Sequence, residues 1–208
     1  MKVGWFVLML GSVLGLAAPA SAQTTTLESL LEAFSGLPGL EARFREEKRI
    51  ALLAVPVRSE GQIWFAHPDR LMRRVTRPEA SATLIDQGQL RMQSGGRTQA
   101  LSIDENPVLR GFVESFRAVL GGNRETLERF YQAELTAGEG DAWELRLTPR
   151  NEALRGFIRE IRMRGHGVSI DEMTMTEVNG DETRTEFFEV NTHRRFSTAE
   201  ARDLFRLR

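Results

Sequence analysis

Alternation of apolar and charged residues with period two runs through most of the chain. Leu40, Ala42 and Phe44 alternate with charged neighbours, and the same period returns in short segments about ten residues apart. Because the side chains of a strand point to opposite faces in turn, this pattern predicts strands with one apolar face. Turn sequences such as Asp86-Gln87-Gly88 and Asn179-Gly180 separate the segments. We expect a mainly β (α+β) fold, a curved antiparallel half-barrel of about ten or eleven strands.

The hairpin of residues 59–78 departs from this alternation. Ile63 and Phe65 point to one face of its first strand, while Trp64 points to the other. A strand that is apolar on both sides needs cover on both sides, from a helix, a second sheet or a ligand. We expect the N-terminal helix to cover one side and a cavity with its lid to lie on the other, and the pattern leaves open which face points inward, so Trp64 and Met72 could replace their neighbours.

Helical periodicity is strongest near the start of the chain. Within residues 24–36, Leu27, Leu30, Leu31 and Phe34 follow the spacing i, i+3, i+4, i+7, which predicts a helix with one apolar stripe. Glycine and proline after this stretch end the helix.

A second helical region interrupts the predicted meander of strands. Residues 108–120 carry a wide apolar stripe that includes Phe112 and Phe116, and Asn123 caps a further short helix. A pair of amphipathic helices inserted here predicts a lid, with helices covering the concave face of the sheet. Ser197 and Glu200 form a capping box for a last, basic helix.

The segment 51–57 is apolar but holds Pro56, which does not fit a central strand. It is interpreted as a hairpin loop. Two alternatives stay open: an ordinary loop packed over the rim of the sheet, or an apolar flap near a cavity mouth.

The first 22 residues have the composition of a secretory signal peptide. Lys2 precedes the apolar run Val3–Ala18, and Ala20-Ser21-Ala22 provides a cleavage site of small residues. The run is short for a spanning helix, which favours cleavage over an uncleaved anchor. We therefore expect residues 23–208 to form one domain that is soluble in the periplasm, held together by its core because the chain has no cysteine.

Charge and composition narrow the function classes. The formal net charge of −1 gives no global attraction to nucleic acid or to a membrane surface. The three histidines, His67, His166 and His193, have no metal-ligand spacing, and the chain contains no nucleophile elbow, phosphate loop or dinucleotide motif. Asp171 and Glu172 are adjacent and would face opposite sides of a strand. We expect no enzyme and no cofactor.

Flexible apolar side chains are abundant in the predicted strands. Met72, Met92, Met163, Met173 and Met175 accompany a chain total of twelve Phe. For any single Met, packing in the hydrophobic core is the better explanation. Together, in an exported protein with a helical lid, they indicate a cavity that accepts variable apolar shapes such as acyl chains.

The chain resembles the periplasmic lipoprotein carriers of the LolA-like family. The resemblance rests on an N-terminal helix that leads into Ala42-Arg43-Phe44, on the hairpin from Gly61 through Pro68 to Leu71, on Pro78 with the turn Ile85-Asp86-Gln87-Gly88, and on the helices at 108–130. It covers most of residues 24–192 and is most specific over 59–90.

This resemblance implies a half-barrel whose cavity shields the acyl chains of a lipoprotein. Cargo would come from an inner-membrane ABC transporter and pass to an outer-membrane receptor, carried by a monomer. His67 stands where relatives have an arginine that holds the lid helices, which implies a lid latch. The lid residues would be Phe112, Phe116 and His67, and the expected cavity residues are Ile63, Phe65, Leu71, Met92, Trp143, Leu145, Met173 and Met175. Carriage of another lipid, such as a glycolipid or a polyketide-derived or aryl-lipid product, and a protein-interaction or sensor module on the same fold are the alternatives.

Overall fold

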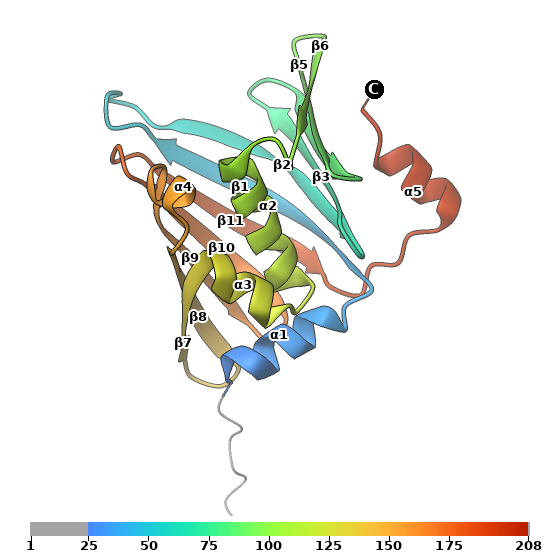
Figure 1. Ribbon diagram of the computed structural model, residues 1–208. Helices are drawn as coiled ribbons and strands as arrows, with labels where there is room; N and C mark the ends of the chain where they lie inside the picture. Colours follow the sequence, from blue (N-terminus) through green and yellow to red (C-terminus); the bar gives the residue numbers. More distant parts are fainter. Residues whose placement is uncertain (1–24, 208) are drawn as a thin grey trace, which may run out of the picture.

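Within residues 25–207, which the computed structural model describes, eleven antiparallel strands form one curved sheet (Figure 1). The predicted signal peptide, residues 1–22, lies outside the described residues. The strands are β1 (Gly39–Arg49), β2 (Val57–Ala66), β3 (Arg70–Arg77), β4 (Ser81–Asp86), β5 (Gln89–Ser94), β6 (Arg97–Ser102), β7 (Tyr131–Ala137), β8 (Ala142–Pro149), β9 (Ile158–His166), β10 (Ser169–Glu177) and β11 (Glu182–Asn191).

The strand order is β6-β5-β4-β3-β2-β1-β11-β10-β9-β8-β7, so the first and last strands of the chain pair at the centre of the sheet. The outer strands β6 and β7 do not pair with each other, and the sheet is an open half-barrel. The predicted fold class is therefore confirmed. Gly61 lies at the bulge between β2 and β3, where a Cβ atom would come within 1.9 Å of the carbonyl oxygen of Arg74, so only glycine fits there.

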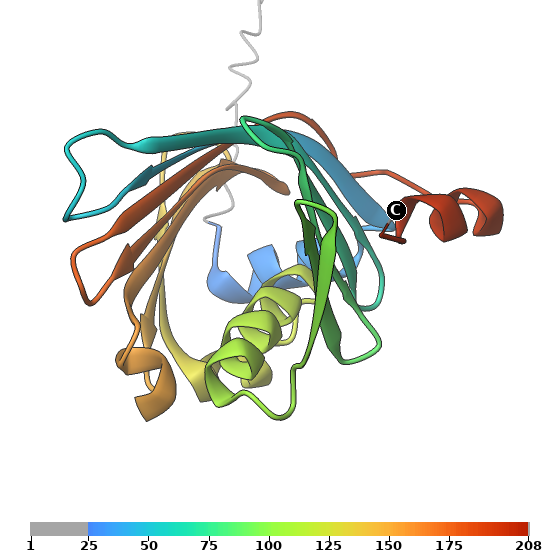
Figure 2. The same cartoon turned by 90° about the horizontal axis from the view of Figure 1, so that it is seen from above.

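The helices are α1 (Leu27–Ser35), α2 (Pro107–Leu120), α3 (Arg124–Phe130), α4 (Glu152–Arg155) and α5 (Thr198–Leu204). Side-chain caps define the starts of the helices: Asn106 Oδ1 accepts a hydrogen bond from the backbone N–H of Leu109 at 2.9 Å, with Pro107 in the first turn of α2. Seen from above, α2 lies in the opening between the two edges of the half-barrel, and α1 lies across its far end (Figure 2).

The N-terminal helix packs inside the half-barrel. Leu30, Leu31 and Phe34 belong to the main hydrophobic core, and the Phe34 ring meets Trp143 of β8 edge to face, with the ring centroids 6.0 Å apart. Our expectation that this helix covers one side of the hairpin at residues 59–78 is therefore wrong for the side that carries Trp64.

Trp64 is covered from outside by the C-terminal helix. Trp64 of β2, Met72 of β3 and Leu84 of β4 form a separate cluster with Phe205, and these four side chains are at most 5% exposed. Helix α5 thus lies on the convex face, in contrast to α1 and α2 (Figure 1). Ile63 and Phe65 point inward, which settles the orientation of the hairpin.

The β1–β2 loop is not packed over the rim. Leu52 is 94% exposed and Val55 is 73% exposed, while the backbone N–H of Ala51 donates to Asp181 Oδ1 at 2.9 Å, at the start of β11. The packed-loop alternative therefore fails for the two apolar side chains, which project into solvent.

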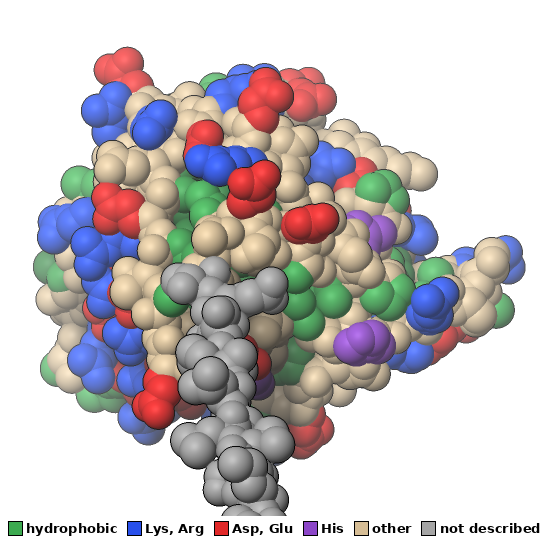
Figure 3. Space-filling view, turned by 90° about the horizontal axis from the view of Figure 1, so that it is seen from below, with side chains coloured by type: hydrophobic (Ala, Val, Ile, Leu, Met, Phe, Trp, Pro, Cys, Tyr) green, Lys and Arg blue, Asp and Glu red, His purple; other side chains and the backbone are tan. Residues whose placement is uncertain are grey.

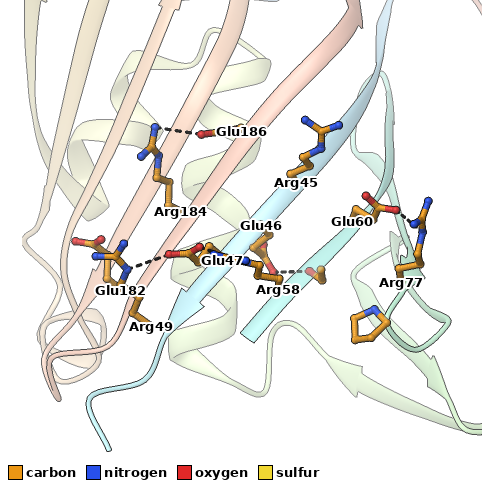
Figure 4. A pocket seen from close by; sticks show the side chains of 12 residues that line it. Arg45, Glu46, Glu47, Arg49, Arg58, Glu60, Arg77, Glu182, Arg184 and Glu186 are labelled. Carbon is orange, nitrogen blue, oxygen red and sulfur yellow. Dashed lines mark hydrogen bonds and ion pairs between the residues drawn. The ribbon is translucent and has the colours of Figure 1, made fainter. Parts of the chain in front are cut away.

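Away from α5, charged side chains cover the outer face of the sheet. Arg and Glu side chains of β1, β2, β3 and β11 surround a hollow of about 700 Å³ (Figure 4). They neutralise one another in pairs such as Arg58 with Glu47 at 3.0 Å and Arg184 with Glu186 at 3.1 Å. Such exposed pairs add little stability, and they keep this face solvated.

Seen from below, where α1 lies, apolar side chains are visible between charged and polar ones (Figure 3).

No helix within residues 25–207 is long and apolar enough to cross a membrane.

Candidate functional site

A cavity separates α2 from the concave face of the sheet. Its wide part has a volume of about 200 Å³, and a narrow extension of about 30 Å³ leads toward the end of α2. Six apolar residues line both parts: Ile63, Phe65, Leu71, Phe116, Met173 and Phe187. The alternating pattern produces this wall, because every second residue of neighbouring strands faces inward at the same level.

The cavity continues into an apolar groove at the surface. Phe112 and Met175 line both spaces, and the groove adds Leu101, Val108 and Phe157 around a volume of about 470 Å³. Phe157 is 60% exposed and Leu101 is 43% exposed. An apolar path therefore leads from solvent to the cavity along the N-terminal half of α2.

Most of the cavity and lid residues predicted from the sequence lie together around the cavity. Seven of them line the cavity: Ile63, Phe65, Leu71, Phe112, Phe116, Met173 and Met175. Three others lie elsewhere. Trp143 and Leu145 are fully packed in the core with α1, and Met92 packs in a small cluster with Leu90, Ile103 and Val113.

Strands β1 and β11 contribute cavity residues that the sequence reasoning missed. Phe44 lines the wide part, Phe187 lines both parts, and Ala42 and Val190 line the narrow part. The alternation of Ala42 and Phe44 was visible in the sequence. Nothing in it showed that β1 and β11 are neighbours at the centre of the sheet.

An ion pair lies on the floor of the wide part. Arg73 Nη2 donates to Glu46 Oε1 at 2.8 Å, and the Arg73 guanidinium stands 4.3 Å from the centroid of the Phe44 ring. Glu46 also accepts hydrogen bonds from the hydroxyls of Ser59 and Thr185. The wall of the wide part is therefore apolar with a hydrogen-bonded polar group at one end.

A second ion pair ties α2 to the sheet. Arg117 Nη2 donates to Asp69 Oδ2 at 2.7 Å, across the gap between α2 and the β2–β3 turn. Both side chains are about one-third exposed or less and line the cavity. Arg117 also donates to Glu114 within the helix at 2.7 Å. This tie places the basic group on the lid and the acidic group on the hairpin.

His67 lies two residues before Asp69 but makes no hydrogen bond to α2 within the described residues. Its Nε2 atom is buried without a partner, and its ring packs edge to face on Phe65 with the centroids 4.9 Å apart. Burial lowers the pKa of His67, so the ring is neutral at pH 7. The contact that crosses to the lid is made by Asp69, and a latch role of His67 stays a prediction.

Replacing Asp69 with Asn is expected to speed opening of α2 about five-fold, because a part-buried ion pair contributes about 1 kcal/mol to the closed state. Stopped-flow fluorescence with an acyl probe should show faster entry and faster exit. Glu114→Gln is the matched control, since it removes the other carboxylate bonded to Arg117 without crossing the gap. Equal rates for the two variants would contradict the tie.

The contribution of His67 to stability is expected to fall as the pH drops below about 6.5, the ordinary pKa of histidine. Because the folded-state pKa of His67 is lowered, the unfolded chain binds the proton first, and stability drops until the pH passes the folded value. His166 has its pKa raised by its hydrogen bond to Asp171, which acts in the opposite direction. Urea unfolding at pH 5 and 7.5 should therefore show a smaller acid loss for His67→Phe than for the wild type. Identical pH slopes would refute this.

Among the described residues, no three Asp, Glu or His side chains converge as metal ligands. The polar groups of the cavity instead form ion pairs and hydrogen bonds. This arrangement is suited to binding and release of an apolar chain beneath α2, which the ion pair of Arg117 with Asp69 holds to the sheet.

The comparisons with known proteins cover nearly the whole chain. Residues 17–202 match the model of a family described as outer membrane lipoprotein carrier protein LolA-like. A solved LolA superfamily protein from Nitrosomonas europaea aligns with 10% identity and a TM-score of 0.47, covering 88% of this chain and 98% of that one. No curated protein matches the sequence.

Two further solved structures align at similar levels. The lipoprotein LppX of Mycobacterium tuberculosis shows 12% identity and a TM-score of 0.44, with 79% of this chain and 94% of that chain covered. The MucA/MucB complex of Pseudomonas aeruginosa shows 15% identity and a TM-score of 0.45, with 82% and 56% covered.

Proposed function

The chain belongs to the LolA-like family of outer membrane lipoprotein carriers, and on that premise we propose that it is a periplasmic carrier of acylated cargo. It shields the acyl chains of a lipoprotein or a related lipid on the way from the inner to the outer membrane. An inner-membrane ABC transporter supplies the cargo and an outer-membrane receptor accepts it. The work is transfer without chemistry.

The observation that carries this proposal is the apolar cavity beneath α2, with its apolar path to the surface. Each methylene group removed from water gains about 0.8 kcal/mol, so even a partly enclosed acyl chain supplies ample driving force. Phe116 on α2 and Met173 on β10 both line this space, and the flexible Met173 side chain can adapt to a chain of variable shape.

The part of the cavity that is enclosed beneath α2 is smaller than its proposed ligand requires. Pockets for drug-sized molecules measure about 300–1,000 Å³, whereas the wide part holds about 200 Å³. An acyl chain that is fully enclosed in this part therefore requires α2 to move outward. Breaking the ion pair between Arg117 and Asp69 contributes to the free energy that this movement requires. An open state of higher free energy favours release of the cargo.

An interaction or sensor module on the same fold would fill the space with its own side chains. The space is open and joins a surface groove through Phe112 and Met175, which favours carriage.

The proposal is tested by titrating the purified protein with a fluorescent palmitoyl probe. We expect saturable binding that unlabelled acyl ligands displace. Absence of saturable binding for every acyl ligand tried would reject the carrier function. The variant Arg202→Ala serves as a control that should bind like the wild type, because Arg202 is exposed on α5, on the opposite side of the sheet from the cavity.

A further inference from the structure

The cavity wall changes from apolar to polar along a single strand. The inward side chains of β1 are Leu40, Ala42 and Phe44, followed by Glu46 and then by Lys48, whose Nζ donates to Glu177 at 2.7 Å. The apolar positions lie toward α1 and the polar ones toward the β1–β2 loop. An amphiphile bound along this strand would have its tail at the α1 end and its headgroup beside Glu46.

Hydrogen bonds from three side chains hold the Glu46 carboxylate of this wall in place. Glu46 accepts three hydrogen bonds, from Arg73 at 2.8 Å, from Thr185 at 3.1 Å and from Ser59 at 3.3 Å. Arg73 is fixed between this carboxylate and the Phe44 ring. A part-buried ion pair costs desolvation energy that a purely apolar wall would avoid. A lipid cavity that only stores tails has no use for it.

Two polar side chains of the cavity wall, Arg73 and Thr183, still have hydrogen-bonding capacity for a ligand. Arg73 uses one of its five N–H donors on Glu46. Thr183 also lines the cavity, is 9% exposed, and makes no side-chain hydrogen bond within the described residues. A ligand group that both donates and accepts hydrogen bonds can therefore be bound between the two side chains.

The charges around the cavity argue against a charged headgroup. Arg73, Arg117 and Lys48 are each paired with a carboxylate, and no cation among them is left for an anion. Of these pairs, only Arg73 with Glu46 and Arg117 with Asp69 line the wide part of the cavity, so its two cations and two carboxylates balance. A phosphate, a carboxylate or an ammonium group would therefore be desolvated without gaining an unpaired counter-charge.

We propose that Glu46, Arg73, Thr183 and Thr185 form a headgroup subsite for an uncharged, hydrogen-bonding group, such as hydroxyls or amides, attached to the acyl chain. This inference rests on the proposed function and specifies its cargo. Free fatty acids and anionic phospholipids are poor ligands, and acylated molecules with a neutral polar head are good ones.

The test compares three ligands with the same sixteen-carbon chain in displacement titrations at pH 8, where the acid and the amine are charged. We expect monopalmitoylglycerol to bind about ten-fold more tightly than palmitate and more tightly than hexadecylamine. Glu46→Gln should raise the affinity for palmitate about ten-fold, because it leaves the Arg73 charge unpaired. Glu47→Gln is the matched control, since Glu47 is the next residue of the same strand but lines neither part of the cavity, and it should leave all three affinities unchanged.

Thr183→Val is a second variant, and Val has a shape similar to that of Thr. It is expected to weaken the binding of monopalmitoylglycerol several-fold and to leave the affinity for palmitate unchanged. Equal affinity for the three ligands, or tighter binding of a charged one by the wild type, overturns the subsite while leaving the carrier function standing. Failure of all three ligands to bind rejects the carrier function itself.

Discussion

Replacing Phe116 with Asp is expected to weaken acyl binding by at least about 100-fold. Phe116 lines both parts of the cavity and faces β10 and β11 across it. The change removes an apolar contact worth about 2 kcal/mol and puts a carboxylate against the acyl chain, where its desolvation costs further energy. A hundred-fold loss corresponds to about 2.7 kcal/mol. Titration with the palmitoyl probe measures the effect directly.

Arg110→Asp provides the control, since Arg110 is exposed on α2 and the new charge meets solvent. It should keep the affinity of the wild type. Circular dichroism and thermal melts must show that both variants are folded. A folded Phe116→Asp variant that binds as well as the wild type would mean that acyl chains do not lie beneath α2.

Replacing Phe205 with Ala is expected to cost about 3 kcal/mol of unfolding free energy. The ring is buried between Trp64, Met72 and Leu84 on the convex face, and it meets Phe196 edge to face with the centroids 5.5 Å apart. Truncation of a buried Phe typically costs about 3–5 kcal/mol, and a helix that can shift toward the gap recovers part of this. Urea unfolding followed by tryptophan fluorescence measures the loss.

Arg202→Ala tests the same helix at an exposed position and should change the unfolding free energy by less than about 0.5 kcal/mol. Acyl binding should be unchanged in both variants at a temperature where they are folded, because α5 lies on the opposite side of the sheet from the cavity. A loss below about 1 kcal/mol for Phe205→Ala would show that α5 adds no cover to Trp64.

The sequence predicted the sheet and its helices well because the period-two alternation is long and the turn residues are frequent. It could not predict which helix covers Trp64. That depends on the path of residues 192–197, which carries α5 to the convex face, and no local pattern encodes this path. The apolar stripe of α1 looked equally suited to either side.

The candidate site was predicted in part for a similar reason. Ile63, Phe65 and Leu71 were found because they share one hairpin, whose register follows from its short turn. The ion pair of Glu46 with Arg73 joins strands that are not direct neighbours, and Asp69 with Arg117 joins residues 48 positions apart. Trp143 and Leu145 have the same alternation as the cavity residues, and only the position of α1 shows that they are core.

An acyl chain is expected to enter the enclosed cavity by moving α2 away from the sheet. Because the chain has no cysteine, spin labels can be placed at Arg110→Cys on α2 and Glu186→Cys on β11 without competing sites. The distance distribution between the labels, measured with and without saturating monopalmitoylglycerol, is expected to shift to longer distances when the ligand binds. An unchanged distribution in a sample shown to hold the ligand would contradict the account.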